Sequence, residues 1–175
     1  MDEMTSRKCV RGKGRSRPNS REDGDRLTEE CLRAAYRLLK YRQRSENELR
    51  IKLSSRFEKI IIDDIIDRLR EVHMVDDVAF AKHWRQQREM LNPHSRKMVC
   101  LELRRKGIDK ELIDRVLYDF DDEENAYRAA IKKANLVLKE GEGDFRRKLG
   151  AFLVRRGFSY EVTRRTTNRL WRELS

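Results

Sequence analysis

Two clusters of acidic side chains could in principle support metal-dependent catalysis in this 175-residue chain, Asp63-Asp64-Asp67 and the four acids at 121–124. Two-metal hydrolysis requires carboxylates that converge on ions about 4 Å apart inside a shaped cavity. The first cluster instead falls early in an expected helix, and the second falls where another helix is expected to start. Acids at these places complement the helix dipole. We therefore predict that the chain has no catalytic residues and is not an enzyme.

Cysteines and histidines form no metal-binding or redox motif either. Cys9, Cys31 and Cys100 are far apart and include no CxxC pair, so neither a zinc site nor a disulfide framework is expected. The three histidines are isolated, and no glycine-rich phosphate loop is present. The sequence thus predicts no metal site and no cofactor. Unpaired thiols, the lack of an apolar run of about 18 residues and the lack of a secretory leader predict a cytoplasmic protein without membrane contact.

Basic side chains are more informative, because the chain has a formal net charge of +11 and its excess cations lie at both ends. Residues 146–175 carry nine Arg or Lys against two Glu, whereas residues 29–145 carry 25 against 24 acids. A guanidinium fork can bind phosphate or carboxylate bidentately. We predict that the C-terminal cations bind an acidic protein surface or a DNA backbone. The candidates are Arg146, Arg147, Lys148, Arg155, Arg156, Arg164, Arg165 and Arg169, with Arg104, Arg105 and Lys106 as a second group.

The expected position of each candidate within its helix separates stronger candidates from weaker ones. Arg155, Arg156 and the cations at 104–106 fall at expected helix C-termini, where the dipole favours positive charge. Helix stabilisation is therefore an alternative explanation for them. Residues 146–148 are expected to open a helix, where cations are disfavoured, so binding to a partner is the better explanation for these three.

Residues 1–28 form a different kind of basic segment. Seven cations and no acid lie between Arg7 and Arg21, among Gly, Ser and Pro18. Such a composition cannot bury enough apolar surface to fold by itself. We predict a disordered basic arm, which either solubilises the protein or attracts nucleic acid electrostatically.

The elements that must position the cations repeat every fifty residues, and each copy is predicted to contain three helices. A repeat of this length indicates stacked helical units. We expect three units, at 29–75, 76–122 and 123–175. The predicted fold class is all-α, with three tandem three-helix repeats in an elongated, curved body. The recurring apolar sets are Leu49, Val99 and Leu149; Leu53, Leu103 and Leu153; and Ile62, Leu112 and Val162.

Capping residues and turns mark where these helices begin and end. Ser45, with Glu48 three residues later, has the form of a capping box, and Pro93 interrupts a helix. Gly107 and Gly157 each follow an inward leucine by four residues, where a left-handed residue ends a helix. The first copy has no such glycine. Further N-caps are expected at Asp76, Asp109 and Ser159.

Three local patterns occur in an order and spacing that is specific to one family. They are the segment Arg44–Leu49, the segment Asp76–Ala81, and two Leu-x-x-x-Gly turns that end at Ile108 and Phe158. Together they resemble the RecX family, bacterial regulators of the RecA recombinase. The resemblance covers about residues 29–175 and leaves out the arm. It implies a crescent of three three-helix repeats that lies in the helical groove of a RecA–single-stranded-DNA filament.

The resemblance implies a non-enzymatic regulator, mainly an inhibitor, that restrains filament growth, ATP hydrolysis and strand exchange, and so acts in DNA repair, recombination and the SOS response. Its partner would be the RecA filament. From the residues themselves we expect a monomer, for which direct contact with single- or double-stranded DNA is possible. The residues alone leave an alternative open, an autonomous DNA-binding protein with helix-turn-helix-like repeats. The third helices of the first two copies are acidic or neutral, so at most one copy could bind DNA in this way.

Overall fold

Evenly spaced Leu, Ile and Ala between charged residues give most of the chain a helical pattern, and the fold follows it. The structure is a computed structural model that describes residues 20–175, with side chains from Asp23 onward. Over this range it contains nine α-helices, one 3₁₀ turn and no strand. The helices are α1 (Ser20–Tyr41), α2 (Glu46–Leu53), α3 (Lys59–Glu71), α4 (Asp77–Met90), α5 (Arg96–Arg105), α6 (Lys110–Val116), α7 (Asp122–Val137), α8 (Glu142–Arg155) and α9 (Tyr160–Leu174), and the 3₁₀ turn η1 (Leu138–Glu140) precedes α8.

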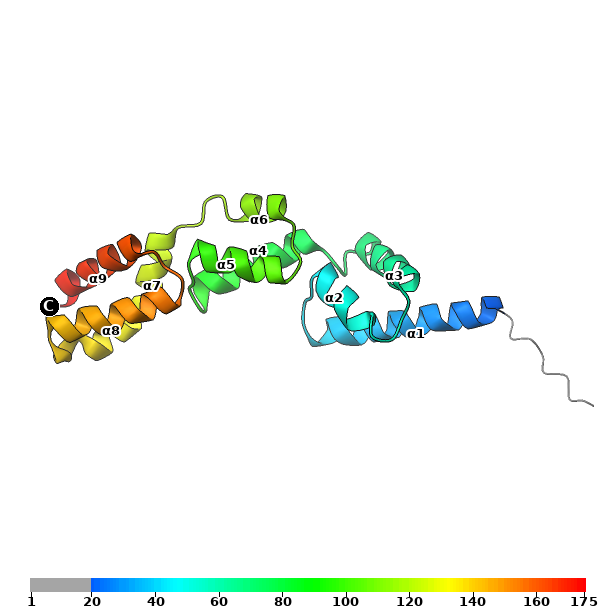
Figure 1. Cartoon of the computed structure of the whole chain (residues 1–175), viewed down its shortest axis with the longest axis horizontal. Helices are drawn as coiled ribbons and strands as arrows, with labels where there is room; N and C mark the ends of the chain where they lie inside the picture. Colours follow the sequence, from blue (N-terminus) through cyan, green and yellow to red (C-terminus); the bar gives the residue numbers. More distant parts are fainter. Residues whose placement is uncertain (1–19) are drawn as a thin grey trace, which may run out of the picture.

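The helices form three groups, α1–α3, α4–α6 and α7–α9, and the main helix–helix contacts fall within each group. Each group encloses its own apolar core. The groups follow one another along a shallow arc with α1 at one end and α9 at the other (Figure 1). The predicted all-α, elongated and curved fold is confirmed. None of the helices that the structure describes is long and apolar enough to span a bilayer.

Burial follows the fifty-residue repeat. The equivalent residues Leu49, Val99 and Leu149 are fully buried, each on the second helix of its group. The leucines four residues later lie on the same helix face and are buried as well. The third recurring set is less regular, because Val162 is only half-buried and Thr163 occupies the buried position beside it. Each core is therefore built around a leucine-rich second helix.

The helix ends follow the predicted signals. The Ser45 hydroxyl accepts the Glu48 N–H, and the Glu48 carboxylate accepts the Ser45 N–H, which completes the capping box of α2. Gly107 and Gly157 follow α5 and α8 with φ of +79° and +87°, a region that glycine occupies without strain. α4 ends before Pro93. The predicted caps of α4, α6 and α9 are also confirmed at Asp76, Asp109 and Ser159.

The predicted disordered arm at 1–28 differs from the structure at its C-terminal end, because residues 20–28 already belong to α1. Asp23 and Asp25 lie near the start of this helix, where acids complement the dipole. Once the packed part of a helix has formed, each further residue adds a hydrogen bond at little cost, so the helix extends beyond its core contacts. The rest of the arm, 1–19, lies outside the described residues.

Candidate functional site

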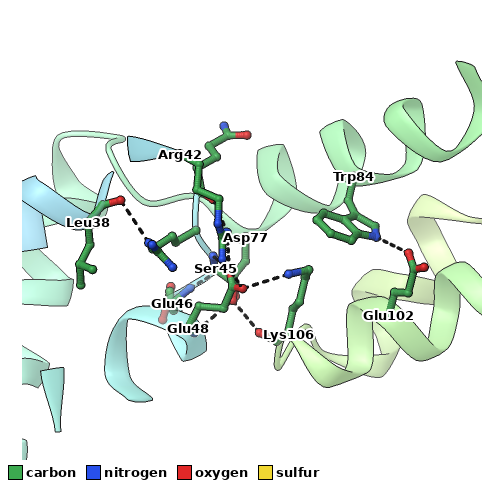
Figure 2. A network of polar contacts seen from close by, with 11 residues as sticks. Leu38, Arg42, Ser45, Glu46, Glu48, Asp77, Trp84, Glu102 and Lys106 are labelled. Carbon is green, nitrogen blue, oxygen red and sulfur yellow. Dashed lines mark hydrogen bonds and ion pairs between the residues drawn. The ribbon is translucent and has the colours of Figure 1, made fainter. Parts of the chain in front are cut away.

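The junction between the first and second groups is a polar contact between the end of α5 and the start of α2 (Figure 2). The Ser45 hydroxyl donates a hydrogen bond of 2.6 Å to the Lys106 carbonyl while it caps α2. The Lys106 ammonium lies 2.9 Å from the Glu48 carboxylate. Arg42 makes two hydrogen bonds of 2.9 Å to the same carboxylate. The capping box of α2 therefore also holds the end of α5.

The charges in this first junction stabilise one another. Burial by itself would raise the pKa of Glu48, but hydrogen bonds and charge attraction from Arg42 and Lys106 outweigh it and lower the pKa to about 2. The Lys106 ammonium also lies 4.1 Å from the centroid of the Trp84 ring, and the Trp84 Nε1–H donates to Glu102 at 2.7 Å. Lys106, one of the predicted binding residues, is thus half-buried and engaged at this junction.

An equivalent junction, displaced by fifty residues, joins the second and third groups. Ser95 caps α5, and its N–H donates to the Arg156 carbonyl at 3.1 Å. The Arg156 guanidinium donates to Asn92 Oδ1 at 2.5 Å and lies 4.6 Å from the centroid of the Phe152 ring. Ser95 and Arg156 take the places of the serine and the lysine in the first junction. Arg156, also predicted to bind a partner, therefore connects two groups.

The two left-handed glycines belong to these junctions as well as to the turns. A Cβ at Gly107 would collide with the side chain of Asn47. A Cβ at Gly157 would lie 2.6 Å from the Ser95 hydroxyl oxygen. Glycine is required at both places because the backbone adopts a positive φ and the neighbouring group approaches it closely.

The basic run at 146–148 lies within α8 and not at its start, so the predicted helix boundary is wrong here. α8 begins at Glu142 because Gly143 costs a helix only about 1 kcal/mol and because Glu142 and Asp144 complement the dipole. The three cations pair with these acids and with one in the preceding turn. The pairs are Arg146–Glu142 at 2.6 Å, Arg147–Asp144 at 2.8 Å and Lys148–Glu140.

Two candidates on α9 are also paired. Arg165 contacts two acids, and Arg169 contacts one acid and lies over an aromatic ring. The partners are Glu123 at 2.7 Å and Glu161 for Arg165, and Glu173 at 2.8 Å and Tyr127, with its ring centroid at 4.1 Å, for Arg169. Exposed ion pairs contribute about 0–1 kcal/mol, so an anionic partner could replace these acids.

Four candidates, Arg104, Arg105, Arg155 and Arg164, are exposed and have no acidic partner among the described residues. The first three lie in the last turns of α5 and α8, where the helix dipole favours cations. Arg164 lies within α9, so neither an ion pair nor a helix end accounts for it. Its guanidinium is therefore exposed and not engaged by an acid of the described part of the chain.

Arg164 lines a groove of about 370 Å³ between α8 and α9. Its other lining residues include the exposed Tyr160 and the buried Thr163 and Thr167, which the sequence analysis did not single out. The fifty-residue alignment carries a signal for the two threonines, because the second copy has Ile113 and Leu117 at these positions. The α8–α9 groove is lined by Arg146, Gly150, Tyr160, Thr163, Arg164, Thr167 and Asn168.

The two acidic clusters do not converge on a common point. Asp63, Asp64 and Asp67 lie further along α3 than predicted, and each pairs with an arginine. Asp121 caps α7, as expected for a helix start. Between residues 23 and 175, no three His, Cys, Asp or Glu side chains are placed to hold a metal ion. These acids therefore stabilise helices and pair with cations.

Comparison with known proteins places the three groups in one family. Models of the first, second and third three-helix domains of RecX match residues 31–69, 76–117 and 121–166. Regulatory protein RecX of Chlorobium limicola is 31% identical over 148 residues, which cover 84% of this chain and 93% of the relative. The protein of the same name from Chlorobium phaeobacteroides is 36% identical over 139 residues, covering 79% and 91%.

Solved structures share the fold. RecX from Lactobacillus salivarius has a TM-score of 0.69 and 24% identity, and the match covers 83% of this chain and 97% of that one. A second structure, described as regulatory protein RecX, has a TM-score of 0.70 and 21% identity, and covers 90% of this chain and 82% of its own. The helical arrangement is thus common to all three proteins.

Proposed function

Since this chain belongs to the RecX family of regulatory proteins, we propose that it regulates the RecA recombinase, mainly by inhibition. The proposed partner is the RecA filament on single-stranded DNA, and a monomer of this chain would lie in the helical groove of the filament. Bound there, it would restrain filament growth, ATP hydrolysis and strand exchange. This action needs no catalytic residue, metal or cofactor of its own, and it takes place in the cytoplasm.

The observation that supports this proposal most is the extended row of three groups along the arc (Figure 1). Each group has a separate core, and the two junctions hold neighbouring groups in register through partly buried polar contacts. An extended helical-repeat body presents a long surface, which suits an extended partner better than a small molecule. Bridging successive protomers of a filament would oppose the movements that accompany ATP turnover.

The distribution of charge supports a mixed interface. The first two groups carry nearly balanced charge, whereas residues 146–175 are strongly basic. We propose that the balanced groups contact protein and that the exposed cations Arg104, Arg105, Arg155 and Arg164 contact acidic side chains or DNA phosphates. Lys106 and Arg156 would act indirectly, because they set the geometry of the junctions.

An autonomous DNA-binding module is the alternative. α9 carries four exposed arginines, Arg164, Arg165, Arg169 and Arg172, which is the charge expected of a helix that binds DNA. α3, the equivalent helix of the first group, carries Asp63 and Asp64 and would repel phosphate. Binding to bare DNA that weakens steeply with salt, in the absence of the recombinase, would favour this alternative.

The decisive experiment measures ATP hydrolysis by RecA on single-stranded DNA while this protein is titrated in. Suppression at substoichiometric concentrations, where bare DNA is hardly bound, is the expected result. Unchanged hydrolysis together with tight, salt-sensitive binding to bare DNA would contradict the proposal and support the alternative.

A pair of variants then tests the basic surface. Arg155→Glu reverses an exposed charge at the end of α8 and should weaken the suppression of ATP hydrolysis. Lys139→Glu is the matched control, because this lysine is also exposed in the third group but lies in the 3₁₀ turn before α8. Equal effects of the two substitutions would mean that only net charge matters.

A further inference from the structure

A groove between the second and third helices occurs in the second and third groups, and its chemistry differs between them. In the second group the α5–α6 groove has a volume of about 430 Å³. Its lining includes the cations Arg96, Lys97 and Arg104 as well as Ile113, Asp114 and Leu117. A shift of fifty residues places Thr163, Arg164 and Thr167 at the last three of these positions. Apolar side chains are thus replaced by hydroxyls, and an acid is replaced by a base.

The first group has acidic residues at the equivalent positions of its third helix. Its equivalent positions hold Asp63, Asp64 and Asp67, and Asp63 pairs with Arg50 across from α2 to α3. An anion would be repelled there. The α5–α6 groove is also lined by cations but by no hydroxyl residue. Of these two grooves, only the one between α8 and α9 combines basic and hydroxyl groups, which is the combination that binds oxyanions.

A buried hydroxyl in the α8–α9 groove lacks a partner. Thr163 is only 6% exposed, and its Oγ1 makes no hydrogen bond within the described part of the chain. Buried polar groups in proteins are nearly always paired, so an unpaired one indicates a missing ligand or water. Arg164, the next residue, is exposed beside the same groove. Both residues line the same groove.

An exposed aromatic ring lies at the mouth of this groove. Tyr160 is the first residue of α9 and is 79% exposed. Single-strand-binding proteins combine basic grooves that follow the backbone with aromatic rings on which bases stack. The Asp and Glu side chains of an acidic peptide would pair with the cations but offer no aromatic face to stack on the ring. The ring therefore favours a nucleic acid over an acidic protein segment.

We propose that the α8–α9 groove binds single-stranded DNA, with a phosphate held by Arg164 and the Thr163 hydroxyl and an adjacent base stacked on Tyr160. Within the proposed function on which it builds, this site would contact the DNA strand of the filament. Arg146, on the opposite wall, would add a second guanidinium once the phosphate displaces its contacts with Glu142 and Asn168. The site itself requires no recombinase, so it can be tested with DNA alone.

The test measures the fluorescence anisotropy of a labelled oligo(dT) of about 20 nucleotides titrated with the full chain at low salt. Tyr160→Ala should weaken binding about 5- to 100-fold, as loss of one stacked base does. Arg164→Ala should weaken binding and reduce the salt dependence by about 0.7 in slope, the value for one lost phosphate contact on a single strand. Thr163→Val, which keeps the shape and so the fold, should weaken binding about 5-fold.

Matched controls lie in the second group. Tyr118→Ala removes a tyrosine that is 88% exposed, and Arg115→Ala removes an exposed cation on α6. Both should leave the affinity for oligo(dT) within about twofold of wild type, because neither lies in the α8–α9 groove. Far-ultraviolet circular dichroism of every variant checks that the helices remain formed.

The outcomes separate this inference from the proposed function. Absence of oligo(dT) binding by the wild type, or wild-type affinity in all three groove variants, would overturn the inference even where RecA ATP hydrolysis is suppressed. Competition by poly-glutamate together with wild-type affinity of Tyr160→Ala would also overturn it and assign the groove to an acidic protein. Groove-dependent oligo(dT) binding without an effect on RecA would support the inference and contradict only the proposed function.

Discussion

Replacing Glu48 by Gln tests whether the junction between α2 and α5 depends on charge as well as on shape. Gln keeps the size of the side chain and can still accept the Ser45 N–H, but it removes the charge that attracts Arg42 and Lys106. The Glu48 side chain is only 17% exposed, so solvent screens these attractions weakly. In the folded protein they lower its pKa from 4.5 to about 2.

The size of the effect follows from this shift in pKa. A difference of about 2.5 units corresponds to roughly 3 kcal/mol, because one unit is about 1.4 kcal/mol. We expect Glu48→Gln to lower the free energy of unfolding by about 2–3 kcal/mol at pH 7. The folded pKa lies below the unfolded one, so this stabilisation is complete above pH 4.5 and is lost as the pH falls towards 2. At pH 3 about 40% of it, roughly 1 kcal/mol, should remain.

Urea unfolding followed by the fluorescence of Trp84 measures this effect at the junction itself. The chain has two tryptophans. The wild-type background and the Glu48→Gln variant therefore both carry Trp171→Phe, so that Trp84 is the only source of tryptophan fluorescence. The Lys106 ammonium over the Trp84 ring makes the signal sensitive to separation of the helices. Glu29→Gln is the control, because Glu29 forms an exposed pair with Arg33 on α1 and should cost less than about 0.5 kcal/mol.

Two results would refute this reasoning. One is a loss of less than about 0.5 kcal/mol at pH 7, which would place Glu48 among ordinary surface ion pairs. The other is a loss that stays constant from pH 7 to pH 3, which would mean that the carboxylate charge does not stabilise the junction.

Two further substitutions test the junctions by steric fit and by capping. Gly107→Ala should lower the free energy of unfolding by about 1–3 kcal/mol, because it combines a positive φ with a collision against Asn47; in urea unfolding, Asn47→Gly in the same chain should recover part of the loss, and no recovery would exclude the collision. Ser95→Ala should lower the free energy of unfolding by about 1 kcal/mol, because it removes the cap of α5. Thermal unfolding measures this effect, with Ser54→Ala, at an exposed serine outside both junctions, as the control. Equal shifts of the unfolding temperature in the two variants would contradict the capping role.

Much of the fold could be predicted from local signals. Ser45 and Glu48 are three residues apart, and Gly107 lies two residues after the end of its helix, so each signal acts within one turn of the chain. The prediction failed at α8, where Gly141-Glu-Gly143 has the composition of a break. The helix nevertheless starts at Glu142. One glycine destabilises a helix by less free energy than the nearby acids and the burial of Phe145 add to its stability.

The binding residues were harder to predict, because the partner of a cation can lie far away in the sequence. Lys106 pairs with Glu48, which is 58 residues away, and Arg156 donates to Asn92, which is 64 residues away. Both looked like surface cations at helix ends, and both connect groups. Conversely, Thr163 has the sequence neighbours of an ordinary helix residue, and its unpaired hydroxyl is evident only from the packing of α8 against α9.

The order of the amino acids was sufficient to define the helices, their caps and the fifty-residue repeat of buried leucines. Capping, left-handed glycine turns and helical periodicity all depend on residues a few positions apart in the chain. It was not sufficient to tell which of the eleven candidate cations join two groups, which pair with acids and which face solvent. Those differences arise where helices from separate repeats meet, since burial and electrostatic pairing depend on distance in space and not on distance along the chain.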